Sequence, residues 1–113
     1  MATSKIKGKT KTTAVINPND VTVYSNHVVK DGTLVFYELL LSTKVAIPDG
    51  AGIVYFPWTF AGRHDCFAQV TNSASSYGLY GAGDSDHFAV NTGANGIPSG
   101  VILFISGFYT TNQ

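Results

Sequence analysis

The sequence is poor in cysteine and has no long hydrophobic run. Its 113 residues include a single cysteine, Cys66, so no intrachain disulfide is possible. Small secreted domains held together by disulfides are therefore excluded. A membrane-spanning helix needs about 20 consecutive apolar residues, whereas the longest apolar-rich runs, Leu34–Leu41 and Val101–Ile105, are far shorter. We expect a soluble chain that does not insert into a membrane.

Charged residues are also scarce, and their distribution is uneven. They make up 12% of the chain, about half the usual share. Residues 1–19 hold four lysines and no acidic residue, whereas all seven acids follow. This basic arm is either a frayed, solubilising terminus or a segment that docks to an acidic partner. Because no arginine or aromatic residue is interleaved with the lysines, we expect no nucleic-acid partner.

The first residues contain no apolar segment of the kind that a secretory signal peptide has. We therefore expect synthesis in a cytoplasm. A protein made in this way and found outside the cell would reach its place of action by assembly into a particle or by lysis.

The apolar pattern of the remaining chain has period two, which is typical of β-strands. Val21 and Val23 begin one alternating run, and the turn Lys30-Asp31-Gly32 leads into Leu34–Leu41. Asp-Gly between two such runs predicts a β-hairpin. The second run is nearly all apolar and is predicted to be a strand buried on both faces. A short helix over Tyr37–Leu41 is the alternative, because Glu and Leu favour helices.

Further short strands are separated by glycine, proline and polar turns. They are predicted at 45–47, 53–56, 66–70, 77–80, 87–90 and 101–109. No convincing helix is found. The pattern predicts an all-β protein: a single-domain antiparallel β-sandwich or jelly roll of about eight strands over residues 20–113, preceded by the short arm of residues 1–19.

Catalytic motifs are missing from the sequence. No Gly-x-Ser-x-Gly element is present, and Cys66 is interpreted as a small buried thiol. The acids show no spacing that indicates paired catalytic carboxylates. The stretch Asp84-Ser85-Asp86-His87 lacks the further ligands of a calcium loop, and the histidines lack zinc-ligand spacing. We expect no enzyme activity, no cofactor and no metal.

What remains is a group of aromatic, charged and imidazole side chains in predicted loops or beside them. Saccharide sites use this mixture, because an aromatic face packs on the apolar face of a sugar ring while polar groups bind its hydroxyls. Trp58 has an alternative role, packing in the core or in a subunit interface beside Phe56 and Phe60. The predicted saccharide-binding residues are Trp58, Arg63, His64, Asp65, Tyr80, Asp84, Asp86 and His87.

A series of short segments occurs in order along the body of the chain: Gly32-Thr33-Leu34-Val35-Phe36, Ala46-Ile47-Pro48, Ile53-Val54-Tyr55-Phe56-Pro57, Tyr77-Gly78-Leu79-Tyr80 and the closing strand 101–109. Through these segments, residues 21–111 resemble the C-terminal head domains of bacteriophage tail-fibre and baseplate receptor-binding proteins. The resemblance implies a homotrimer at a phage tail tip or baseplate that binds saccharides of the host cell surface, without catalytic machinery.

The chain departs from that family because it lacks a long stalk before the head. We therefore expect the N-terminal arm to contact other virion proteins directly. The alternative is a small structural virion protein, such as a head-fibre or capsid decoration subunit, anchored by the arm. A small cell-wall hydrolase is the third hypothesis, and no group of residues supports it.

Overall fold

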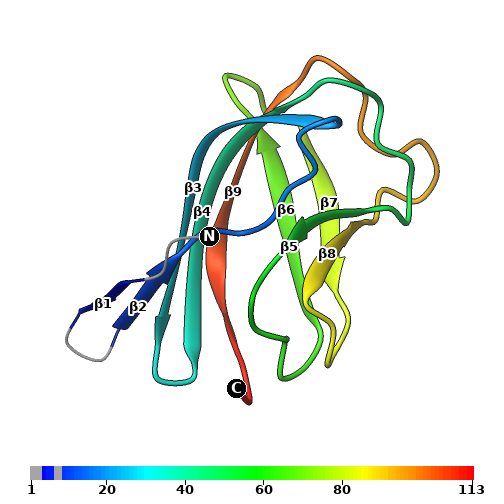
Figure 1. Ribbon diagram of the computed structural model, residues 1–113. Coiled ribbons are helices and arrows are strands. Elements are labelled where there is room, and N and C mark those ends of the chain that lie inside the picture. The colour runs from blue at the N-terminus through cyan, green and yellow to red at the C-terminus, as the bar shows by residue number, and fades with distance from the viewer. Residues whose placement is uncertain (1–3, 7–8) are drawn as a thin grey trace.

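The computed structural model describes residues 4–6 and 9–113, and all the regular structure in these segments is β-strand (Figure 1). The strands form one antiparallel sheet in the order β1-β2-β3-β4-β9-β6-β7-β8-β5. No helix in the described part of the chain is long and apolar enough to cross a membrane. The strands are β1 (Ser4–Ile6), β2 (Lys9–Thr12), β3 (Val21–Asp31), β4 (Leu34–Thr43), β5 (Gly52–Tyr55), β6 (His64–Val70), β7 (Ser76–Gly81), β8 (His87–Val90) and β9 (Ile102–Thr110).

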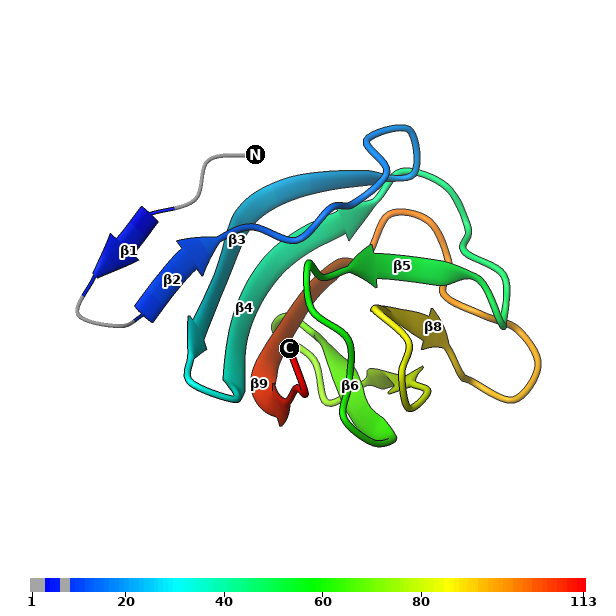
Figure 2. The same cartoon turned by 60° about the horizontal axis from the view of Figure 1, so that its bottom comes forward.

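The sheet is strongly curved, so that β5 at one edge lies close to the segment that follows β2, whereas β1 and β2 themselves lie apart from β5 (Figure 2). Val15, which follows β2, exchanges two backbone hydrogen bonds with Tyr55 of β5, with N···O distances of 2.8 and 3.0 Å. The two halves of one continuous sheet therefore enclose the core, as the two layers of a sandwich would. The predicted all-β, single-domain fold with about eight strands is confirmed.

The predicted hairpin at Asp31-Gly32 is confirmed as the β3–β4 connection. Gly32 has φ +61°, a left-handed conformation that favours glycine at this turn. The helical alternative over Tyr37–Leu41 is wrong, because these residues belong to β4. Burial of β4 on both faces is also wrong. Alternate residues from Val35 to Leu41 are buried, but Phe36 on the other face is 43% exposed, as expected for an antiparallel sheet with one open face.

Aromatic rings fill the core between the two halves of the sheet. Phe60 and Phe88 are fully buried, and their ring centroids lie 5.4 Å apart. The ring centroid of Tyr109 lies 4.5 Å from that of Phe60, and the ring centroid of Tyr37 lies 5.5 Å from that of Phe88. These contacts join β4, β8, β9 and the segment before β6, so they hold the sheet in its curled shape.

Several predicted boundaries need correction. The segment 45–47 is not a strand, since only Ile47 pairs, in an isolated bridge with Ile97. β6 begins at His64 rather than at Cys66, which moves His64 and Asp65 from the predicted loop into the sheet.

Part of the predicted basic arm belongs to the sheet. Lys9–Thr12 pairs with β3, and Ala14 is 5% exposed within the core. The side chain of Asn26 binds both the backbone N–H and the carbonyl of Ala14, at 2.8 Å each. The side chains of Lys5 and Lys7 lie outside the described residues.

Candidate functional site

An open groove of about 460 Å³ lies between the β6–β7 hairpin and the loop that follows β8. Phe67 of β6 and Ser76, Tyr77 and Gly78 of β7 line one side, and residues of the segment 91–96 line the other. Phe67 is the most exposed aromatic residue in the described part of the chain, at 69%. The groove therefore offers an uncovered aromatic ring beside a polar loop.

The Phe67 ring is uncovered because its cross-strand neighbour is Gly78, which has no side chain. Gly78 is required here by the close approach of Asn91, the first residue after β8. A Cβ at this position would lie 2.5 Å from the carbonyl oxygen of Asn91. The Asn91 N–H donates a 2.9 Å hydrogen bond to the Gly78 carbonyl, so the polar loop is held directly against β7.

Further hydrogen bonds fix the shape of the loop. The Thr92 N–H and hydroxyl both donate to one carboxylate oxygen of Asp49, at 2.7 and 3.1 Å. The Gly96 N–H donates to the Thr92 hydroxyl at 2.8 Å. The side-chain amides of Asn91 and Asn95, by contrast, are exposed and make no hydrogen bond within the described residues. They are free to bind a ligand.

Three of the predicted site residues come together next to this groove. The Arg63 Nε donates to an Asp65 carboxylate oxygen at 2.9 Å, and the Arg63 guanidinium lies 5.0 Å from the centre of the Tyr80 ring. Asp65 and Tyr80 are cross-strand partners. Their side chains share the outer face of the sheet with Phe67, because alternate residues of a strand point to the same face.

His64 points the other way, into the core. Its Nε2 lies 2.7 Å from the Tyr37 hydroxyl, and its ring stacks on Phe60 with centroids 5.9 Å apart. Burial lowers the pKa of His64, which favours the neutral ring. The structure therefore separates His64 from the outward-facing Arg63 and Asp65, with which the sequence grouped it.

Cys66 also faces inward and packs against the core. Burial raises the pKa of its thiol to about 11, so the thiol is protonated near neutral pH. A nucleophilic cysteine requires a thiolate and thus a lowered pKa. The arrangement is opposite to that of a catalytic cysteine.

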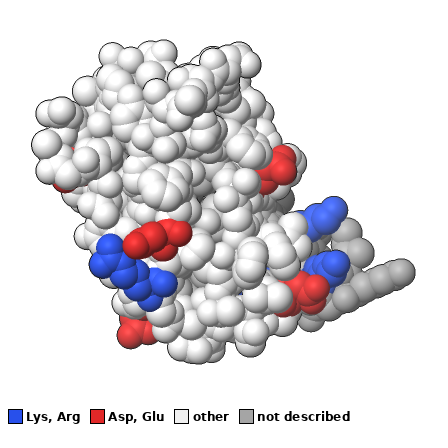
Figure 3. Space-filling view, turned by 180° about the vertical axis from the view of Figure 1, so that it is seen from behind, with Lys and Arg blue, Asp and Glu red and all other residues white. Residues whose placement is uncertain are grey.

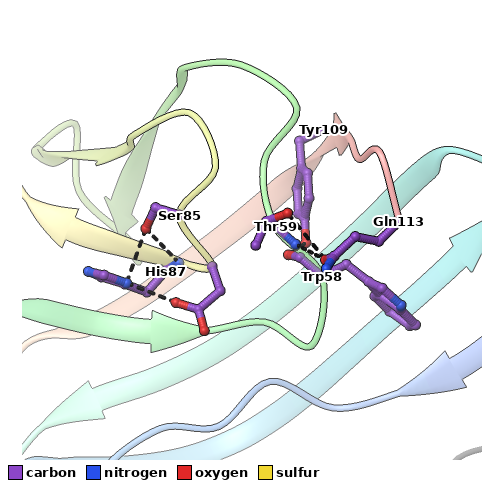
Figure 4. Close-up of polar contacts among 7 residues, drawn as sticks. Trp58, Thr59, Ser85, His87, Tyr109 and Gln113 are labelled. Carbon is purple, nitrogen blue, oxygen red and sulfur yellow. Dashed lines mark hydrogen bonds and ion pairs between the residues drawn. The ribbon is translucent and has the colours of Figure 1, made fainter.

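Asp84 and Asp86 lie in the connection between β7 and β8, and His87 is the first residue of β8. Figure 4 shows His87 next to Ser85. The His87 Nδ1 lies 3.0 Å from an Asp86 carboxylate oxygen and 3.2 Å from the Ser85 hydroxyl. The His87 ring stacks on Tyr55 at 4.7 Å. A serine hydrolase needs the serine and the acid on opposite ring nitrogens, whereas both groups here share one nitrogen. The geometry of the trio is therefore not that of a catalytic triad.

Trp58 lies in the connection between β5 and β6 (Figure 4). It is half-buried against the core, and its carbonyl accepts a 2.8 Å hydrogen bond from the Tyr109 hydroxyl. Lys30 Nζ lies 5.8 Å from the Trp58 ring. None of the predicted residues lines the groove of about 460 Å³. No group of three or more potential metal ligands occurs among the residues that the structure describes.

The groove itself was missed by sequence reasoning, although one signal pointed to it. Every second residue of β6 faces the core, namely His64, Cys66, Ala68 and Val70. Phe67 lies between them and therefore faces outward, which is unusual for an aromatic residue. No protein-family model matches the chain, and a search of curated proteins finds no match.

Proposed function

We propose that the protein is a non-enzymatic virion protein of a bacteriophage tail or baseplate that attaches to saccharides on the host cell surface. One observation carries the binding part of this proposal: the exposed Phe67 ring lies in a groove beside the free amides of Asn91 and Asn95. The assignment to a phage is supported by the resemblance of residues 21–111 to receptor-binding heads.

The groove has the chemistry that a sugar requires. The Phe67 ring supplies an apolar platform for the C–H face of a pyranose. Each asparagine amide offers both a donor and an acceptor to the hydroxyl groups. The Thr92–Asp49 hydrogen bonds hold the loop in place before a ligand arrives, which lowers the entropic cost of binding.

A homotrimer is part of the proposal, and the outer face of β4 and β9 supports self-association. Phe36 and Phe108 are cross-strand partners with ring centroids 5.8 Å apart, and they are 43% and 57% exposed. Phe104 and Ile102 extend this apolar surface along β9. Seen from the back of Figure 1, the molecule shows a wide area with few charged side chains (Figure 3). Several copies acting together would turn weak single sites into firm attachment.

The second candidate is a structural virion subunit anchored by its arm. Lys9 and Lys11 favour it, because both are exposed on β2 and can meet an acidic surface. Deletion of residues 1–16 would be a poor test, since it removes β2 and the buried Ala14. Replacing Lys9 and Lys11 with glutamine keeps the strand. Loss of particle incorporation by this double variant, with unchanged glycan binding, would favour the role of a structural subunit.

The proposed saccharide binding is tested on an array of bacterial surface glycans with the full chain. We expect Phe67→Ala to weaken binding about tenfold or more, as loss of an aromatic contact and its apolar area implies. Tyr24→Ala is the matched control, because it removes an exposed aromatic residue that lies outside the groove and is not part of the Phe36–Phe108 surface. Absence of glycan binding by the wild-type chain, or equal losses in both variants, would contradict the proposal.

A further inference from the structure

The outer face of the β6–β7 hairpin continues beyond the groove. Phe67 pairs with Gly78, and the next outward pair along the hairpin is Asp65 with Tyr80. Successive outward pairs of an antiparallel sheet are about 6.8 Å apart, a spacing comparable to the length of one sugar ring. The small residue Ala89 lies opposite Tyr80 on β8. The surface from Phe67 to Asp65 is thus a continuous strip.

Arg63 and Asp65 retain unused hydrogen-bonding capacity in this strip. Their mutual contact uses only Arg63 Nε and one Asp65 oxygen. The two terminal amino groups of Arg63 and the second oxygen of Asp65 make no hydrogen bond within the described residues. Free donors beside a free acceptor match a pair of neighbouring sugar hydroxyls, each of which can both donate and accept.

Tyr80 holds the arginine in position. The guanidinium lies 5.0 Å from the centre of the Tyr80 ring, a cation–π distance that restricts the long side chain. Tyr80 therefore acts through Arg63, as a positioning residue.

The charges of the strip favour an uncharged ligand. The described residues that line the groove carry no charged side chain, and Arg63 and Asp65 cancel each other. The β7–β8 loop, which holds Asp84, lies beside this end of the hairpin, since a Cβ at Gly83 would lie 3.7 Å from the Arg63 backbone nitrogen. An anionic capsule or phosphate-rich polymer would meet repulsion there.

We propose that the site is extended and takes a neutral oligosaccharide of at least two rings. One ring packs on Phe67 and binds Asn91 and Asn95, and the neighbouring ring binds Arg63 and Asp65 through a pair of hydroxyls. This inference rests on the proposed saccharide binding and adds the length and charge of the ligand.

The experiment uses the full chain and an array that carries neutral and acidic glycans, from single sugars to longer oligomers. Calorimetry with the single sugar and the oligomers of the best neutral series then gives the affinities. We expect the second ring to raise affinity about tenfold, as hydrogen bonds to charged groups imply. Arg63→Gln and Asp65→Asn should abolish this gain and leave binding of the single sugar unchanged. Tyr80→Phe should keep the gain, whereas Tyr80→Ala should lose it.

The outcomes separate the two proposals. The extended neutral site would be overturned by affinity that does not depend on glycan length, by an unchanged gain in Arg63→Gln, or by preference for acidic glycans. In each case the Phe67 groove is judged separately, by the effect of Phe67→Ala. Binding of no glycan by the wild-type chain would overturn both. Circular dichroism in the near ultraviolet checks that each variant keeps its tertiary packing.

Discussion

Substitution of Gly78 by alanine tests whether the groove depends on the close contact between β7 and the loop after β8. The new Cβ would lie 2.5 Å from the Asn91 carbonyl oxygen, far inside the normal contact distance. Because the obstacle is backbone, relief requires movement of the loop and weakens the 2.9 Å hydrogen bond from Asn91 to Gly78. Strain of this kind typically costs about 1–3 kcal/mol. We expect that loss in the free energy of unfolding, measured by urea denaturation.

Gly83→Ala is the matched control for Gly78→Ala. A Cβ at Gly83 would have its nearest neighbour at 3.6 Å, an ordinary contact, so the change should be neutral or slightly stabilising through the unfolded chain. Gly78→Ala should also weaken glycan binding, because it displaces Asn91, whereas Gly83→Ala should not. Equal stability of the two variants would refute the reasoning that Gly78 is required by packing.

Three further predictions concern titration and assembly. Because the pKa of Cys66 is raised to about 11, its alkylation by iodoacetamide should be slow at neutral pH and accelerate up to about pH 11; fast labelling at pH 7 would contradict the burial. His64 has a folded pKa below its unfolded value of 6.5, so its contribution to stability is complete above that value and is lost as the pH falls below it; His64→Gln should flatten the acid limb of the stability profile. Light scattering should give three times the chain mass for the wild type and a lower mass for Phe36→Ser combined with Phe108→Ser, and a monomeric wild type would remove the trimer from the proposal.

The class of fold was predictable because its signals are local. Alternation of apolar residues and the Asp31-Gly32 turn require no knowledge of distant contacts. The two-sided burial of Leu34–Leu41 was wrong because apolar composition was read as burial. The composition of a strand does not show whether anything covers its second face, and Phe36 is left exposed in the described structure.

The groove could not be predicted because it depends on register. Phe67 becomes exposed only when Gly78 is its cross-strand partner, and Asn91 approaches only because β8 lies beside β7. The same applies to His64, whose direction follows from where β6 begins. Strand starts and pairings set by the tertiary structure are beyond what a single sequence determines.

The position of β9 has a consequence for how the chain reaches its folded state. β9 lies in the middle of the sheet, where it pairs with β4 from Leu34↔Thr110 to Ser42↔Ile102 and with β6 at two positions (Figure 1). Within the sheet, β9 joins the β3–β4 hairpin on one side to the β6–β7 hairpin on the other. During synthesis, the edge of β4 that pairs with β9 therefore stays unpaired until residues 44–110 have been made. Folding of the sheet is therefore completed late and depends on pairing between strands far apart in the sequence. Aggregation would begin at the edges that are still unpaired.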